Sequence, residues 1–176
     1  MTHSKILIAY ASRSGSTEEI AQFIGTCLKQ AGLEVDVLPV SDVRELSIYQ
    51  AIVVGSAIRK SAWLPEAIQF VQTHRSELSR KPFATFTVCI TLAMSNSDLY
   101  RQAVSKWIQP VHSQVKPLSE GLFPGRLEFS RLSWNWDTMK LRLVVALGIF
   151  PKEDRRDWNA VRTWANQLHP LLIQEW

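Results

Sequence analysis

The sequence predicts a three-layer α/β/α fold built on a five-stranded parallel sheet in the order 2-1-3-4-5. Short apolar segments of strand length alternate with amphipathic segments of helical period along the chain. The strand segments are nearly unbroken apolar runs, which indicates strands covered by helices on both faces. A length of 176 residues and a hydrophobic fraction of 46% suit one domain with its own core. We therefore expect a single domain over residues 1–176, with its ligand site at the carboxyl ends of the strands.

The first half of the chain is expected to form three strands and two helices. Lys5–Tyr10 is a short, β-rich run, Glu34–Val40 alternates as a strand, and Ala51–Gly55 is wholly apolar. Between the first two strands, the apolar face of a helix recurs at Ile20, Ile24, Cys27, Leu28 and Ala31. Gly32 supplies the stop of that helix. Leu64–Leu78 is predicted to form one further helix.

The second half continues the alternation. Phe83–Thr91 is an apolar strand, Asp98–Ile108 has the pattern of a helix, and Val115–Phe123 is expected to carry the last strand. Asp157–Leu168 closes the domain as a helix. Its predicted inner face consists of Trp158, Val161, Trp164, Ala165 and Leu168.

Composition narrows the class of protein. The two cysteines, Cys27 and Cys89, form no CxxC pair, which is typical of buried thiols in the reducing cytoplasm. The apolar run near the N-terminus is too short to span a membrane. A net charge of +4 favours anionic partners such as phosphates, acidic lipid headgroups or a substrate carboxylate. It argues against a soluble electron carrier, whose surface is usually acidic. Because no five like charges occur in a row, no nucleic-acid partner is predicted.

The loop Ser12–Thr17, between the first strand and the first helix, has the chemistry of a phosphate site. It offers four hydroxyls and the backbone N–H groups of a helix start, and Gly15 lets the backbone turn close to a ligand. Ser16 and Glu19 are interpreted as a capping box. A polar loop that only caps the helix is the alternative. GxxxxGK[ST] and GxGxxG are both absent, which excludes the two best-known phosphate loops.

Three segments together carry a family resemblance. S-x-S-G-x-T at residues 12–17 resembles the flavodoxin phosphate loop. VVGSAIR at residues 53–59 resembles the second flavin loop of the menaquinone-dependent protoporphyrinogen IX dehydrogenase group, and FTVCITLA at residues 86–93 resembles its third. The resemblance covers about residues 5–170 and implies a flavodoxin-like fold and non-covalent binding of FMN.

The resemblance also implies which residues surround the FMN. Its phosphate would be held by Ser12, Arg13, Ser14, Gly15, Ser16 and Thr17. The reactive edge of its ring would be bordered by Gly55, Ser56, Ala57, Ile58 and Arg59, and its pyrimidine side by Thr91, Leu92 and Ala93. A small residue at position 55 would leave a peptide group free to follow the hydrogen-bonding needs of the ring N5 atom.

Individual side chains near the ring have alternative roles. Arg59 is the candidate catalytic residue: it would raise the flavin potential or hold a substrate carboxylate, or else form a solvated pair with Lys60. Trp63 would stack on the ring or pack as a hydrophobic staple for the following helix. The four histidines, His3, His74, His112 and His169, are interpreted as surface residues, and no metal site is predicted.

Residues 126–150 depart most from a short flavodoxin. Large apolar residues recur there at helical spacing among basic ones, as in helices that lie at a membrane interface. The alternatives are packing against the domain or against a second subunit, so a homo-oligomer stays open. The resembled dehydrogenases have an insertion here that serves substrate access and quinone chemistry. GIFPKED at residues 148–154 replaces the glycine-rich stretch expected from that family, which bears on the porphyrinogen substrate.

The resulting expectation is an FMN-dependent oxidoreductase of heme biosynthesis that passes electrons from a protoporphyrinogen-like substrate to a quinone or a redox partner protein. It would be cytoplasmic, or peripheral at the inner face of the membrane. One alternative is a flavodoxin-type electron carrier without a substrate of its own. A flavin-free scaffold is the other.

Overall fold

The computed structural model describes residues 5–94, 97–126, 139, 154 and 156–173. Its five main strands are parallel and ordered β2-β1-β3-β5-β6, which confirms the predicted 2-1-3-4-5 order. A short strand, β4, pairs antiparallel with β3 at one end of the sheet. The strands are β1 (Lys5–Ala11), β2 (Glu34–Pro39), β3 (Ala51–Arg59), β4 (Ala62–Trp63), β5 (Phe83–Cys89) and β6 (Glu120–Pro124).

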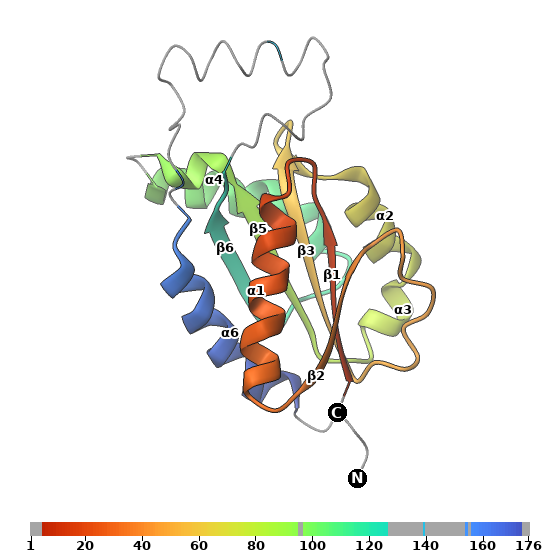
Figure 1. The fold of residues 1–176 in the computed structure, drawn as a ribbon. Coiled ribbons are helices and arrows are strands. Elements are labelled where there is room, and N and C mark those ends of the chain that lie inside the picture. The colour runs from red at the N-terminus through yellow and green to blue at the C-terminus, as the bar shows by residue number, and fades with distance from the viewer. Residues whose placement is uncertain (1–4, 95–96, 127–138, 140–153, 155, 174–176) are drawn as a thin grey trace.

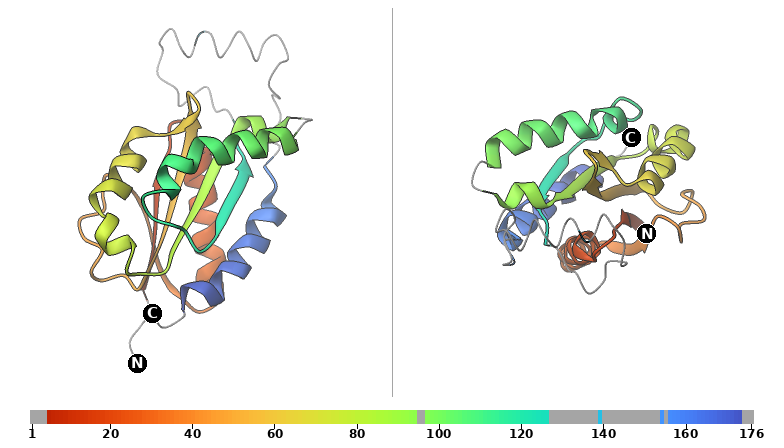
Figure 2. Two further views of the ribbon diagram at one scale, coloured as in Figure 1. Left: turned by 180° about the vertical axis from the view of Figure 1, so that it is seen from behind. Right: turned by 90° about the horizontal axis from the view of Figure 1, so that it is seen from above.

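Helices cover both faces of the sheet (Figures 1 and 2). One face is covered by α1 (Ser16–Gln30) and α6 (Trp158–Leu172). The other is covered by α2 (Pro65–Thr73), α3 (Arg75–Leu78) and α4 (Ser97–His112), and a 3₁₀ helix, η1 (Ile90–Ala93), follows β5. The two larger clusters of buried side chains lie one on each side of the sheet, as in the three-layer architecture that the alternation predicts, and a small third cluster contains Cys89, Leu92 and Val104.

Strand β1 shows why the strands are apolar without alternation. Ile6, Ile8 and Tyr10 pack toward α1 and α6, whereas Leu7 and Ala9 pack toward the opposite helices. Both faces of the central strands are therefore excluded from water, and a polar residue on either face would be buried. Cys27 and Cys89 are buried free thiols, as expected.

Several element boundaries were predicted wrongly. The helix expected over Leu64–Leu78 is two helices, because the backbone of His74 leaves the helical conformation between them. The strand expected to end at Gly55 continues to Arg59, because it pairs with the unpredicted β4. The last strand begins at Glu120 rather than at Val115.

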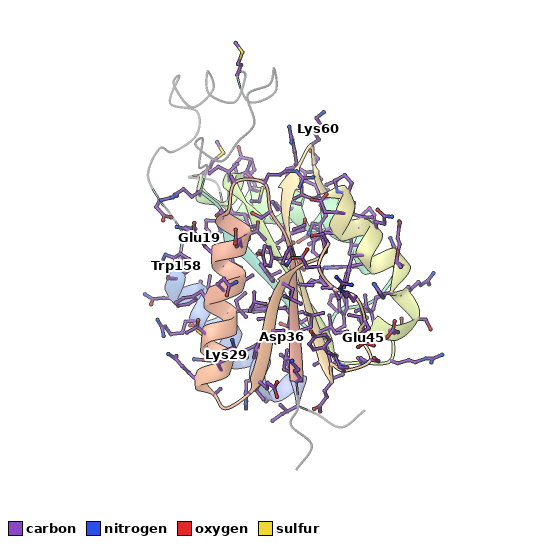
Figure 3. All side chains as sticks on the ribbon, turned by 45° about the vertical axis from the view of Figure 1, so that its right-hand side comes forward. Glu19, Lys29, Asp36, Glu45, Lys60 and Trp158 are labelled. Atoms are coloured by element: carbon purple, nitrogen blue, oxygen red, sulfur yellow. The ribbon has the colours of Figure 1, made fainter. Side chains whose placement is uncertain are left out.

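Asp36 on β2 joins three segments at the end of the sheet opposite Lys60 (Figure 3). The Nζ of Lys5 lies 2.9 Å from its Oδ2, and the hydroxyl of Tyr49 donates to the same oxygen at 2.7 Å. Burial would raise the pKa of Asp36, but the hydrogen bonds from Lys5 and Tyr49 hold it below its usual value. Burial, together with the bond to Asp36, raises the pKa of Tyr49 to about 12.

We expect Asp36→Asn to lower the free energy of unfolding at pH 7, by no more than about 1 kcal/mol because solvent screens the pair. The folded-state pKa of Asp36 lies below the unfolded one, so its stabilisation is present above the unfolded pKa. It is lost as the pH falls through the folded pKa. Urea unfolding of Asp36→Asn at pH 7 and in acid measures this, with the exposed Glu45→Gln as control. A destabilisation of equal size at both pH values would contradict it.

Candidate functional site

The carboxyl ends of β1, β3, β5 and β6 meet at one edge of the sheet, at the top of Figure 1. The segments that follow these strands border this edge. They are the loop before α1, the turn between β3 and β4, helix η1, and the backbone at Gly125–Arg126. Each of the three segments singled out from the sequence thus reaches this edge with at least part of its length.

The loop Ser12–Thr17 turns sharply into α1. Gly15 is the N-cap of that helix, with φ at 85° in the left-handed region, and its N–H donates to Oγ of Ser12 at 3.0 Å. No side chain caps the first turn, so the predicted capping box is wrong. Ser16 lies inside the helix instead, because the turn at Gly15 places the cap one residue earlier than the capping box requires. The helix start therefore leaves backbone N–H groups without a side-chain cap.

A second backbone segment closes the loop from the other side. The N–H of Arg126 donates to Oγ of Ser16 at 3.0 Å, and Oγ of Ser14 lies 3.5 Å from the carbonyl oxygen of Arg126. The N–H of Gly125 donates to the carbonyl of Cys89 at 3.1 Å, which joins this segment to β5. This wall was not predicted from the sequence. Its signal was Pro124-Gly125 at the end of the last strand, a dipeptide that marks a turn.

The first turn of α1 carries two acidic residues, Glu18 and Glu19. Glu19 pairs with Arg156, whose guanidinium also binds Asp154 and lies 4.6 Å over the ring of Trp158. The side chain of Arg156 is only 5% exposed, whereas that of Glu19 is 41% exposed, so the ion pair is buried on the arginine side and reached by water on the glutamate side. Since a carboxylate at a helix start repels an anion, the neutralisation of Glu19 favours anion binding at the loop.

The second predicted segment lies mostly inside the sheet. Gly55 pairs with Tyr10 and Phe86, and a Cβ at position 55 would approach the ring of Phe86 to 1.9 Å. The need for a small residue is therefore accounted for by packing. Oγ of the buried Ser56 accepts the N–H of Leu64 at 3.0 Å and donates to the carbonyl of Ala57 at 2.9 Å.

Only the end of this segment reaches the edge. Ala57 and Ile58 are partly buried, and Arg59 is exposed at the last position of β3. Trp63 on β4 is 1% exposed, and its Nε1 donates to Oγ1 of Thr87 at 2.9 Å. It is a core residue without an exposed ring face, so the stacking role suggested for it is wrong.

The third predicted segment comprises the end of β5 and the helix η1. Leu92 and Ala93 are buried, and Thr91 is partly buried with its Oγ1 3.1 Å from Sγ of Cys89. Burial raises the pKa of the Cys89 thiol, although hydrogen bonds at Thr91 lower it in part. Cys89 is consequently held as a neutral thiol beside the edge.

Arg13 points away from the loop toward α2. It forms a bidentate ion pair with Glu66, with Nη2 2.9 Å from Oε2. Burial would raise the pKa of Glu66, but the hydrogen bond from Arg13 keeps it below its usual value. Arg13 lines two depressions, one of about 520 Å³ beside the loop and one of about 740 Å³ beside the β3–β4 turn.

Two predictions concern residues elsewhere. Among the described residues, no group of three metal-ligating side chains could hold a metal ion. The surface assignment of His112 is wrong: its Nε2 lies 3.1 Å from Oγ1 of Thr85, and burial lowers its pKa. Its place at the end of α4, against the sheet, explains the difference.

The membrane-interface prediction for residues 126–150 falls outside the described residues, apart from Arg126 and Met139. Within the described part of the chain, no helix is both long and apolar enough to cross a bilayer.

The sequence and the fold of this chain are similar to those of known proteins. The family described as "Flavodoxin domain" matches residues 7–151. Protoporphyrinogen IX dehydrogenase [quinone] of Escherichia coli K12 is 25% identical over 176 residues, covering 95% of this chain and 96% of the relative. The enzyme of the same name from Leishmania major is 25% identical, and the match covers 96% of this chain and 76% of the relative. The solved structure of a flavodoxin from the domain Archaea superposes on this chain with a TM-score of 0.58 at 16% identity. The match covers 97% of this chain and 99% of the flavodoxin.

Proposed function

Because the chain belongs to the flavodoxin domain family and is distantly related to protoporphyrinogen IX dehydrogenase, we propose that it is an FMN-dependent oxidoreductase. In this proposal FMN binds at the carboxyl edge of the sheet. A reduced, protoporphyrinogen-like substrate is oxidised there, and a quinone accepts the electrons.

The observation that carries the FMN proposal is the start of α1. Its first-turn N–H groups lack a side-chain cap, and the hydroxyls of Ser12, Ser14 and Ser16 belong to the same loop and first turn. A phosphate monoester needs several convergent donors, and a helix start adds a favourable dipole. The residues present therefore fit the phosphate of FMN, and the neutralised Glu19 removes one source of repulsion.

The remaining segments would hold the flavin ring. Helix η1 and the end of β3 stand on the same edge as the phosphate loop, where they would border the ring and exclude water from it. Bound FMN would supply the electron or hydride chemistry. In this proposal the cation of Arg59 either favours negative charge on the reduced ring or holds a carboxylate of the substrate.

The proposal is tested in two steps. Titration of FMN into the apoprotein should quench flavin fluorescence and raise the melting temperature. The holoprotein should then be reduced anaerobically by protoporphyrinogen and reoxidised by a menaquinone analogue. FMN binding without turnover of either compound would leave an electron carrier instead of an enzyme. Absence of FMN binding would remove both.

A quinone acceptor dissolves in membranes, so we further propose that the protein works at the inner face of the membrane, with residues 126–150 as the contact. Co-sedimentation with vesicles containing anionic lipid should depend on these residues and weaken with salt. Equal sedimentation with neutral vesicles would contradict the electrostatic part of this proposal.

A further inference from the structure

A depression of about 740 Å³ lies between the β3–β4 turn, the phosphate loop and α2. Its size is that of small-molecule sites in proteins. The lining residues are Arg13, Arg59, Lys60, Ala62, Trp63, Leu64, Pro65, Ile68, Gln69 and Gln72. Figure 3 shows Lys60 at the tip of the turn, at the edge of the sheet where the candidate site lies.

The lining has two chemical parts. Three of the described lining residues carry positive charge: Arg13, whose charge is offset by its ion pair with Glu66, and Arg59 and Lys60 on the turn. No described lining residue is acidic. The rest of the wall is mainly apolar, with the buried Trp63 and Leu64 beneath the more exposed Pro65 and Ile68. An apolar surface with cations at one rim matches a ligand with an apolar body and an anionic end.

The turn that carries the cations is closed by pairing of the strands on either side of it. Arg59 pairs with Ala62 across a two-residue turn, in which Lys60 and Ser61 have φ values of 51° and 58°. Turns of this kind favour asparagine and glycine, because other residues are strained at positive φ. A lysine at this position costs stability, and its cation stands at the rim of the depression.

We propose that this depression binds an apolar organic carboxylate, with the carboxylate at Arg59 and Lys60 and the apolar body against Pro65 and Ile68. Arg13 lines both this depression and the one beside the phosphate loop, so the two sites adjoin. Identifying the carboxylate as the reducing substrate rests on the proposed function, whereas the binding site itself does not.

The test compares 1-pyrenebutyrate with 1-pyrenebutanol, which share the apolar body and differ in charge. Fluorescence titration of the full-length protein should show tighter binding of the acid. Arg59→Gln with Lys60→Gln should weaken the acid about tenfold or more and leave the alcohol nearly unchanged. The control, Arg80→Gln with Lys116→Gln, removes the same charge from exposed positions elsewhere and should bind the acid like the wild type.

A second variant guards against misfolding. Lys60→Asn with Ser61→Gly relieves the positive-φ strain, so it should raise the melting temperature while binding pyrenebutyrate more weakly. Equal affinity for acid and alcohol, or equal weakening by the control pair, would overturn the proposal. FMN titration of the same proteins distinguishes the carboxylate site from the proposed function. Tighter binding of the acid than of the alcohol by a protein that does not bind FMN would contradict the proposed function and support this site.

Discussion

Gly55→Ala is expected to lower the free energy of unfolding by about 3 kcal/mol or more, since overpacking of this severity forces the core to move. Three ring atoms of Phe86 would lie within 2.4 Å of the new Cβ, with the nearest at 1.9 Å. Gly55 is paired on both sides in the middle of the sheet, between Tyr10 and Phe86. Neither strand can withdraw without breaking its ladder. Urea or guanidinium unfolding measures the loss.

Gly32→Ala is the matched control. Gly32 has φ at 90°, but no atom lies within 4 Å of the position that a Cβ would occupy, so only backbone strain of about 1 kcal/mol is expected. Phe86→Leu combined with Gly55→Ala should recover part of the loss, because the two residues contact each other. If Gly55→Ala were as mild as Gly32→Ala and instead weakened FMN binding, the packing explanation would fail, and the place at the flavin ring that the resemblance implies for Gly55 would account for the result.

Ser14→Asp is expected to weaken FMN binding by about 100-fold or more, equivalent to about 2.7 kcal/mol. Ser14 is partly exposed within the loop, and its Oγ lies 3.5 Å from the carbonyl oxygen of Arg126. A carboxylate there would face the phosphate dianion at the helix start, where donors are required. Fluorescence titration at low ionic strength measures the effect most sensitively.

Riboflavin provides the control for this prediction, because it carries the same ring without a phosphate. Its affinity should be nearly the same for Ser14→Asp and for the wild type. Ser76→Asp adds an equal charge at an exposed position in α3 and should leave FMN binding unchanged. Equal weakening of FMN and riboflavin by Ser14→Asp would place the phosphate elsewhere.

The phosphate site proposed at Ser14 and the carboxylate site proposed at the β3–β4 turn adjoin each other. Arg13 is the physical link between them, since it belongs to the loop by sequence but pairs with Glu66 on α2. Its ion pair stands where the two depressions meet. The sequence predicts that the guanidinium of Arg13 binds a phosphate. In the structure, Glu66 binds this guanidinium and would compete with the phosphate for it.

Local patterns were sufficient for the fold and for the position of the edge. The apolar runs of β1, β3 and β5 can be buried only between two layers of helices, so the layers and the parallel strands follow from local sequence. Gly15 and the hydroxyls around it indicate a sharp, polar turn into a helix. These signals lie within a few residues of one another, and the sequence alone determined them.

Contacts between distant residues were decided only by the tertiary structure. Gly55 lies against the ring of Phe86, and the hydroxyl of Ser56 accepts the N–H of Leu64. The N–H of Arg126 donates to the hydroxyl of Ser16 and closes the loop. No local sequence pattern encodes contacts across such separations. The strand beyond Gly55 was extended by pairing with β4, and the pairing placed Arg59 and Lys60 beside α2. The physical reason is that packing and hydrogen bonding depend on which side chains meet in space, and chain topology determines those encounters.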